Sequence, residues 1–366
     1  PAPGFRSDAI SFSGDGSALV VNCSYRCADV NRTIVVDVAT GATRAEYRGH
    51  DSSVTASVVM PDGVTAVTAG GTANEIHMWE IATGAPAKVL KGVGRPVTAV
   101  AIDAAGRNIA WGSDNPCPQA VACPQVMGAL LRELALPAAD RDFENPRQAG
   151  PEASRLSRAV HEAGGWSLAA VEGGAQSFEN GALQVAQDGA VRHVIENDAQ
   201  NGFYHSSYTL LRRGGEFVTG GGDGTMIAYR LEDGAFAGEF LGGHSGEVHA
   251  MAEAANARLL LTGSADQTLR LWNLDTRELV VSMFFSDQDW VIWTPQGYYH
   301  SSPNGDRIVG WQVNQGPDRE ARYMWARQLK QHLNSPEIVR RAIILGNAEQ
   351  AVRDLRPQET RLEELL

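Results

Sequence analysis

The sequence predicts an all-β fold, a seven-bladed β-propeller of four-stranded antiparallel blades, with a short helical extension at its C-terminal end. The main observation is a recurring signal, a strand ending in an aromatic or branched anchor followed by a polar turn, at residues 36–41, 79–84, 229–234, 271–276 and 311–316. The anchors Val36 and Trp79 lie 43 residues apart, as do Tyr229 and Trp272, and Trp311 follows after 39. Self-similarity at this period is typical of propeller blades.

Alternating apolar residues, β-branched residues and glycine turns predict the strands of each blade. Blades 1, 2 and 3 have strands at residues 10–12, 19–22 and 33–38, then at 54–60, 65–69 and 75–81, then at 97–102, 109–112 and 130–136. Blade 4 covers residues 166–196, with strands near 167–171, 183–186 and 191–195. Blades 5, 6 and 7 span residues 207–231, 248–274 and 290–313.

The number of blades depends on the 150 residues between Trp79 and Tyr229. Three steps of about 43 residues fit if roughly 20 residues are inserted, whereas four steps do not. The excess falls at residues 114–125 and in a polar, proline-containing connection at 137–165. Seven blades follow, and six or eight stay open as alternatives.

Residues 317–366 predict a helical extension or linker outside the propeller domain of residues 1–316. Trp325, Leu329 and Leu333 recur every four residues, which predicts a helix over 322–333. Pro336 opens a second helix and Asn347 caps a third. The chain starts at Pro1 and stops at Leu366, so we expect further parts on both sides. Because few residues precede the first strand, the outer strand that closes blade 7 comes from the extreme N-terminus or is absent.

Composition limits the partners of this chain. Its 366 residues are 43% hydrophobic, enough for a large core. A net charge of −12 argues against nucleic acid and anionic membranes, because both require a basic face. No apolar run approaches the roughly 20 residues that span a bilayer. We therefore expect a protein partner, no membrane insertion and no cofactor.

Polar residues recur at fixed offsets within the blades. A histidine precedes a threonine by 18 residues in blades 2 and 6, and an anchor follows. A His–Asp–Thr set also suggests acyl-transfer catalysis, but a catalytic site would occur once rather than with the blade period. The set therefore predicts a structural hydrogen-bond network, in which loss of Asp266 costs roughly 1–3 kcal/mol. Its members are His50, Thr68, Trp79, Thr219, Asp223, His244, Thr262, Asp266 and Trp272, with Tyr229 in place of tryptophan in blade 5.

The four cysteines form two local pairs, Cys23 with Cys27 in blade 1 and Cys117 with Cys123 in blade 3. These blades lie two places apart round the ring, so a shared zinc ion is not expected. Two small disulfide loops are predicted, which favours a periplasmic or secreted location over the cytoplasm. Free thiols in a reducing compartment are the alternative.

Two sets of residues carry a family resemblance. The pairs Gly49-His50, Gly243-His244, Trp79-Glu80 and Trp272-Asn273 resemble the hallmarks of WD-repeat propellers. Residues 289–299, and then Ser301 through residues 311–316, resemble the closing blade of bacterial WD-repeat proteins fused to a caspase-like peptidase domain. The resemblance implies that this chain is the non-catalytic propeller of such a protein, with the peptidase elsewhere on the polypeptide.

The sequence is compatible with two functions that belong to different classes of protein. The first is a non-catalytic protein-interaction or regulatory propeller, whose partner is the peptidase domain of the same polypeptide. Loops at the starts of the inner strands converge around the axis and vary between blades, so they are the candidate partner surface. The candidate residues are Arg95, Trp166, Tyr204, Glu247 and Asp289. The alternative is an enzyme or a small-ligand-binding propeller with its site at the central channel.

Overall fold

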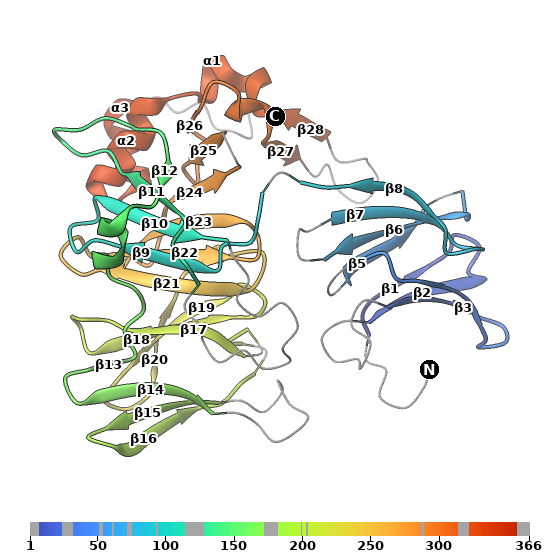
Figure 1. Ribbon diagram of the computed structural model, residues 1–366, viewed down its shortest axis with the longest axis horizontal. Coiled ribbons are helices and arrows are strands. Elements are labelled where there is room, and N and C mark those ends of the chain that lie inside the picture. Colours follow the sequence, from blue (N-terminus) through green and yellow to red (C-terminus); the bar gives the residue numbers. More distant parts are fainter. Residues whose placement is uncertain are drawn as a thin grey trace. The chain divides into compact units, whose positions relative to one another are not determined.

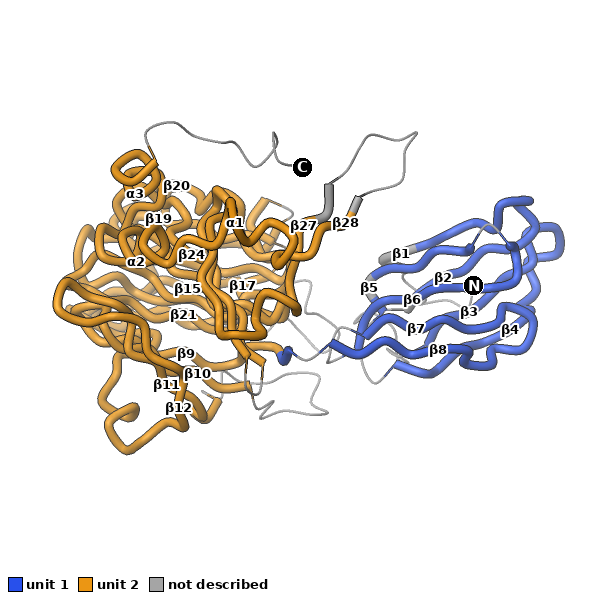
Figure 2. Tube along the Cα trace, turned by 90° about the horizontal axis from the view of Figure 1, so that it is seen from above, with its two compact units in different colours: residues 1–95 blue, residues 96–366 orange. Residues whose placement is uncertain are grey.

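The computed structural model describes residues 7–23, 32–50, 54–60, 62–71, 75–92, 94–113, 128–171, 182–198, 200–202, 204–286, 289–313 and 322–356 (Figure 1). The chain forms two compact units, residues 1–95 and 96–366 (Figure 2). The described residues form 28 strands in seven antiparallel sheets, of which five have four strands, one has six and one has two. The all-β, seven-bladed fold class with a short helical extension is thereby confirmed.

The first unit holds two four-stranded sheets in simple up-and-down order. Their inner strands are in contact, and the Val59 amide donates to Ser11 Oγ at 3.1 Å. Aspartates close the turns; Asp62 Oδ1, for example, accepts the Thr65 amide at 2.9 Å. The strands are β1 (Ser7–Phe12), β2 (Ala18–Cys23), β3 (Thr33–Asp37), β4 (Thr43–Tyr47), β5 (Val54–Val59), β6 (Thr65–Gly70), β7 (Glu75–Glu80) and β8 (Pro86–Leu90).

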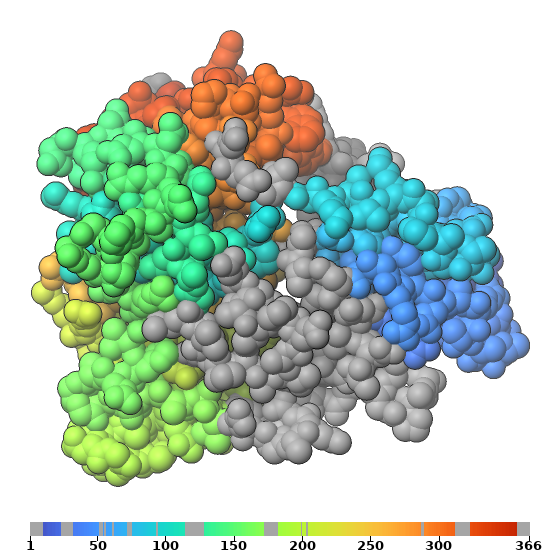
Figure 3. Space-filling view, in the orientation of Figure 1, coloured from blue at the N-terminus to red at the C-terminus, as the bar shows by residue number. Residues whose placement is uncertain are grey.

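The second unit begins with three more four-stranded sheets. They are β9 (Ala99–Ile102), β10 (Asn108–Gly112), β11 (Arg132–Ala135) and β12 (Arg147–Gln148); β13 (Glu162–Ala163), β14 (Trp166–Val171), β15 (Ala182–Gln187) and β16 (Ala190–Ile195); and β17 (His205–Leu210), β18 (Glu216–Gly221), β19 (Met226–Arg230) and β20 (Phe236–Glu239). The connection predicted at 137–165 contains β12, β13 and the short helix η1 (Pro151–Arg155). On the face shown in Figure 3, green atoms of residues 128–171 form much of the surface of this unit.

The last eight strands are divided differently from the prediction. Blade 7 was expected as a separate sheet over 290–313, yet β25 pairs with β24, with Met283 opposite Ile292. The physical reason is a hairpin connection, since the Ser286 amide donates to the Asp289 carbonyl at 2.8 Å. One six-stranded sheet results, with β21 (Val248–Ala254), β22 (Leu259–Ser264), β23 (Thr268–Asn273), β24 (Leu279–Phe285), β25 (Trp290–Trp293) and β26 (Tyr299–Ser301). β27 (Gly310–Val313) and β28 (Arg322–Trp325) form a two-stranded ribbon.

The helix predicted over 322–333 is wrong in its first third. β28 pairs with β27 there, with Met324 opposite Trp311, because an exposed strand edge carries amides and carbonyls that need partners. β28 thus supplies the partner of β27 that was expected from the extreme N-terminus or was expected to be absent. Helical structure follows in η4 (Ala326–Leu329), α1 (Lys330–Leu333), α2 (Pro336–Leu345) and α3 (Ala348–Leu355). None of these described helices is long and apolar enough to cross a membrane.

The sheets of the second unit do not pack in chain order. β21 contacts β17 and also β9, which comes from blade 3 (Figure 1). The Val97 amide donates to the Ser264 carbonyl at 2.9 Å, and the Asn256 amide donates to the Ala104 carbonyl at 2.8 Å. Gly263 permits this approach, since a Cβ there would lie 2.5 Å from Val97 Cγ1. The main core of the unit therefore joins the sheets of β9–β12 and β21–β26 with the buried faces of α2 and α3.

Candidate functional site

The polar residues of blade 6 form one continuous buried chain of hydrogen bonds. Trp272 Nε1–H donates to Thr262 Oγ1 at 2.9 Å, and Thr262 Oγ1 lies 2.7 Å from His244 Nε2. His244 Nδ1 lies 2.9 Å from Asp266 Oδ2. Thr262 sits in β22 and Trp272 in the adjacent strand β23, so the paired strands hold both groups in register. The structure thus brings together all four residues that the sequence offsets single out in this blade.

The chain of donors fixes the protonation of its members. A neutral His244 donates from Nδ1–H to Asp266 and accepts the Thr262 hydroxyl proton at Nε2, so every polar hydrogen has an acceptor. Burial lowers the pKa of His244, which keeps the ring neutral, although Asp266 opposes this effect. Burial by itself would raise the pKa of Asp266, but hydrogen bonds from His244 and Thr268 outweigh it and hold the pKa well below its usual range.

The Asp266 carboxylate also contacts residues other than His244. Its carboxylate is 6% exposed and also accepts the Ser245 amide at 3.0 Å and the Thr268 hydroxyl at 2.6 Å. Arg270 lies beside it, with Nη2 at 3.6 Å, and donates to the carbonyls of residues 242 and 243. The network therefore fixes the loop before β21 to the turn between β22 and β23.

This geometry does not suit acyl-transfer chemistry. The His244 side chain is 0% exposed, and Thr262 is also 0% exposed. A nucleophile must reach a substrate, and the Thr262 hydroxyl is enclosed between His244 and Trp272. The arrangement instead cross-links strands, which is what a structural network does.

Blade 2 repeats the chain without the aspartate. His50 Nε2 lies 2.9 Å from Thr68 Oγ1, which also accepts Trp79 Nε1–H at 3.2 Å. The Trp79 ring stacks on Tyr47, with ring centroids 4.8 Å apart and planes 3° apart. Aromatic stacking thus reinforces the network in the core of the first unit.

A second histidine, which the sequence reasoning missed, lies against this chain. The His77 ring stacks on His50 with centroids 3.8 Å apart and planes 14° apart. His77 bonds the Tyr47 hydroxyl at 2.7 Å through Nδ1 and Glu75 at 2.7 Å through Nε2. Glu75 in turn pairs with Lys91, whose Nζ lies 2.7 Å from Glu75 Oε1. Alternating residues of β7 carry Glu75, His77 and Trp79 on the same buried face, and this alternation is the signal that could have found them.

His50, Glu75 and His77 offer ligand atoms within 4.8 Å of one another, which is close enough to consider a metal ion. Imidazole lone pairs lie in the ring plane, and the two rings are nearly parallel at 3.8 Å. One ion cannot lie along both lone pairs unless a ring turns. Both nitrogens of His77 are also already engaged, by Tyr47 and Glu75. The arrangement therefore suits a hydrogen-bond network better than a cation site.

Blade 5 differs from the sequence expectation. Asp223 is exposed, and its carboxylate accepts the Thr225 amide at 2.9 Å. Thr219 and Tyr229 are buried. Asn201 lies 18 residues before Thr219, the offset of the histidines, and is 4% exposed. It hydrogen-bonds Tyr229 and donates through Nδ2 to the Glu196 carbonyl at 2.6 Å. Asn201 therefore occupies the histidine position, which the 18-residue offset could have revealed.

The candidate partner residues fall in both units. Arg95 is exposed at the end of the first unit. Trp166 is half-buried at the start of β14, and the Tyr204 ring lies over Gly222 just before β17. Glu247 Oε1 lies 3.8 Å from His249 Nδ1. Asp289 accepts the Ser302 hydroxyl at 2.7 Å, so it also ties the start of β25 to the residue that follows β26.

The cysteine pairs stay predictions. Cys27, Cys117 and Cys123 lie outside the described residues, and so does the side chain of Cys23, whose backbone ends β2. The assignment of the two disulfides therefore has no structural test.

Comparison with known proteins supports the assignment of WD repeats. Residues 238–273, which contain the His244 network, match the family model described as WD domain, G-beta repeat. A stretch of 79 residues is 34% identical to the angio-associated migratory cell protein of Homo sapiens, and the proteins of that name from Pongo abelii and Canis lupus familiaris match equally. The stretch covers 22% of this chain and 18% of each relative. These matches support a WD-repeat propeller that serves as a protein-interaction scaffold, but not the activity or partners of the whole relatives.

Proposed function

We propose that this chain is the non-catalytic, protein-binding propeller of a bacterial protein that also carries a caspase-like peptidase domain. The observation that carries the proposal is the buried His244–Thr262–Trp272 chain inside the matched WD repeat. It uses the polar groups that most resemble catalytic residues to hold strands together. Residues 289–299 and 311–316 resemble the closing blade of propellers that are fused to a peptidase domain. This resemblance supports the choice of the peptidase domain as the partner.

The variable loops before the inner strands are the proposed binding surface. In the second unit these loops present Trp166, Tyr204, Glu247 and Asp289, and Arg95 is the candidate in the first unit. Large amphipathic side chains such as Trp166 and Tyr204 suit the centre of an interface. Glu247 and Asp289, the acids that a channel enzyme would use, lie next to His249 and Ser302 within the fold.

The test measures the affinity of the chain for the peptidase domain encoded in the same reading frame. Trp166→Ala combined with Glu247→Lys should weaken binding by at least about tenfold, or roughly 1.4 kcal/mol. Arg95→Glu is measured separately because it lies in the other unit. Glu239→Lys, an equal charge change at an exposed site on β20, is the control. A reading frame without a peptidase domain, or equal affinities for all variants, would overturn the proposal.

A further inference from the structure

The ribbon of β27 and β28 (Figure 1) carries two large aromatic side chains on an exposed face. Tyr323 is 49% exposed and Trp325 is 40% exposed. They lie two residues apart in β28, so both project from the same side of the strand. Trp311 and Met324, which are paired on the opposite side, pack against the main core of the unit. The ribbon is therefore held by one face and leaves its other face open.

The two exposed rings are in contact at a right angle. Their centroids lie 5.0 Å apart and their planes are 90° apart. Gly310 lies opposite Trp325 in β27 and lets the Tyr323 ring approach the strand closely, since a Cβ there would lie 2.6 Å from the Tyr323 hydroxyl oxygen. Edge-to-face contacts of this kind stabilise aromatic pairs. Tyr323 and Trp325 thus form one apolar surface with two walls, which we call the aromatic corner.

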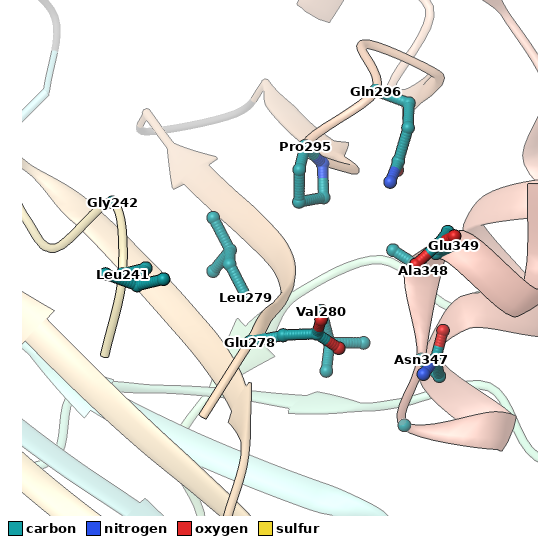
Figure 4. Close-up of a pocket in the computed structure, with 11 residues that line it drawn as sticks. Leu241, Gly242, Glu278, Leu279, Val280, Pro295, Gln296, Asn347, Ala348 and Glu349 are labelled. Atoms are coloured by element: carbon teal, nitrogen blue, oxygen red, sulfur yellow. The ribbon is translucent and has the colours of Figure 1, made fainter. Parts of the chain in front are cut away.

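Leu241, the most exposed apolar residue of this unit, provides a contrast. It is 72% exposed beside the pocket between β24 and α3, and none of the residues that line this pocket, all of them described, is aromatic (Figure 4). Single exposed apolar side chains are common on soluble proteins and need no partner. Two large rings in contact are a better basis for a binding site, because aromatic residues are enriched at interfaces.

The polar atoms of the aromatic corner have no hydrogen-bond acceptor among the described residues. Burial raises the pKa of the Tyr323 hydroxyl, and no hydrogen bond to another described residue offsets this effect. The Trp325 Nε1–H also lacks an acceptor, because the Gln328 amide beside the indole is itself a donor. A ligand that brings carbonyl oxygens can therefore accept a hydrogen bond from each ring.

The charges next to the aromatic corner are positive. Arg327 is exposed two residues after Trp325, and it pairs with no carboxylate of the part of the chain that the structure describes. The exposed Lys330 adds a second cation, although Asp306 offsets it at 3.3 Å. An acidic residue of a ligand would therefore be attracted to this end of the corner.

We propose that the aromatic corner binds a proline-containing segment of a protein partner, in the polyproline II conformation and with acidic residues at one end. Polyproline II leaves its carbonyl groups free, because it makes no internal hydrogen bonds. Proline has no amide N–H, so such a segment matches a site whose free polar groups can donate. Proline-rich segments dock on aromatic side chains, and the preformed helix loses little entropy on binding. The corner consists of other residues than the loop surface proposed above and does not depend on it.

The probe is acetyl-hexaproline-Asp-Asp-amide, titrated against the whole chain and followed by saturation-transfer NMR. The matched probe replaces the prolines with alanines and keeps the length and the charge. The proline probe should bind at least about fivefold more tightly, because the alanine chain has more conformational freedom to lose. Equal binding of the two probes, or binding of neither, would overturn the inference.

Three variants test the location of the proline probe. Trp325→Ser should reduce its affinity at least about tenfold, and Tyr323→Phe, which keeps the ring and removes only the hydroxyl, should reduce it about threefold. Phe236→Ser is the control, because it removes an aromatic ring that is 60% exposed on β20, and its effect should stay below about twofold. Thermal unfolding of each variant checks that the fold is kept. Equal effects of Trp325→Ser and Phe236→Ser, or no effect of Tyr323→Phe, would refute the aromatic corner.

A charge reversal tests the acidic end of the ligand. Arg327→Glu should weaken binding of the Asp-Asp probe about threefold and strengthen binding of a hexaproline probe that ends in Lys-Lys. Added salt should reduce both effects. An unchanged preference between these two probes would refute the acidic end.

The two proposals fail separately. Trp166→Ala with Glu247→Lys should leave binding of the proline probe unchanged, because neither residue belongs to the aromatic corner. This measurement needs no peptidase domain, so it stands whether or not the loop surface binds one. Loss of probe binding in the Trp166 and Glu247 variant would place the proline site on the loop surface and overturn its assignment to the ribbon.

Discussion

Asp266→Ala should lower the free energy of unfolding by about 3 kcal/mol. The largest part comes from the fully buried His244 Nδ1–H, which loses the Asp266 carboxylate at 2.9 Å and keeps only the longer contact with Thr268 Oγ1 at 3.2 Å; a buried donor without a good acceptor costs about 1–3 kcal/mol. A smaller part comes from Thr268, whose hydroxyl donates to the same carboxylate at 2.6 Å. The Ser245 amide is exposed and can bond water instead. Arg270 keeps its two carbonyl acceptors, which limits the cost of losing the neighbouring charge.

The matched control for this variant is Asp223→Ala. Asp223 follows Thr219 by four residues, as Asp266 follows Thr262, but it is exposed and should cost less than about 0.5 kcal/mol. Both variants are compared by guanidinium unfolding, with the midpoint and the slope fitted together. Equal midpoint shifts for the two variants, or a loss below about 1 kcal/mol for Asp266→Ala, would refute the assignment of a buried structural network.

Three further predictions follow. Burial lowers the pKa of His205 to about 4, so unfolding should become easier as the pH falls from about 6.5 towards 4, by up to about 3 kcal/mol; His205→Gln should flatten this dependence in denaturation curves measured at each pH. Gly224→Ala should destabilise by more than 3 kcal/mol, because φ is +95° and the new Cβ would lie 1.9 Å from the His244 carbonyl, whereas Gly242→Ala, with open space around it, should cost about 1 kcal/mol by thermal unfolding. Thiol titration under denaturing, non-reducing conditions should find no free thiols, and four would place the protein in a reducing compartment; the cysteines are Cys23, Cys27, Cys117 and Cys123.

Local signals were enough to predict most strands and the blade 6 network. The strands of blade 4 fall within two residues of their predicted bounds, because alternation and tight turns act over short distances. The His244 chain follows from offsets that two adjacent strands hold in register. Asn201 could have been found by the same offset, but an amide replaces the imidazole, so the pattern of residue types did not show it.

Features set by long-range packing could not be read from the sequence. The four-residue spacing of Trp325, Leu329 and Leu333 suits a helix, yet residues 322–325 pair with β27 because that strand needs a partner. The packing of β9 against β21 and β22 depends on Val97, just before β9, fitting over Gly263 in β22, and these two residues are 166 positions apart. The pocket beside α3 combines residues from 241 to 349, and no local pattern points to it.

The most direct test of the account is hydrogen–deuterium exchange of the whole chain with and without the peptidase domain of its own polypeptide. Protein-interaction function through the variable loops predicts slower exchange in the complex at residues 163–167, 204–206 and 246–248, and unchanged exchange in the buried strands β22 and β23. Unchanged exchange at those loops, with protection elsewhere or nowhere, would contradict the account.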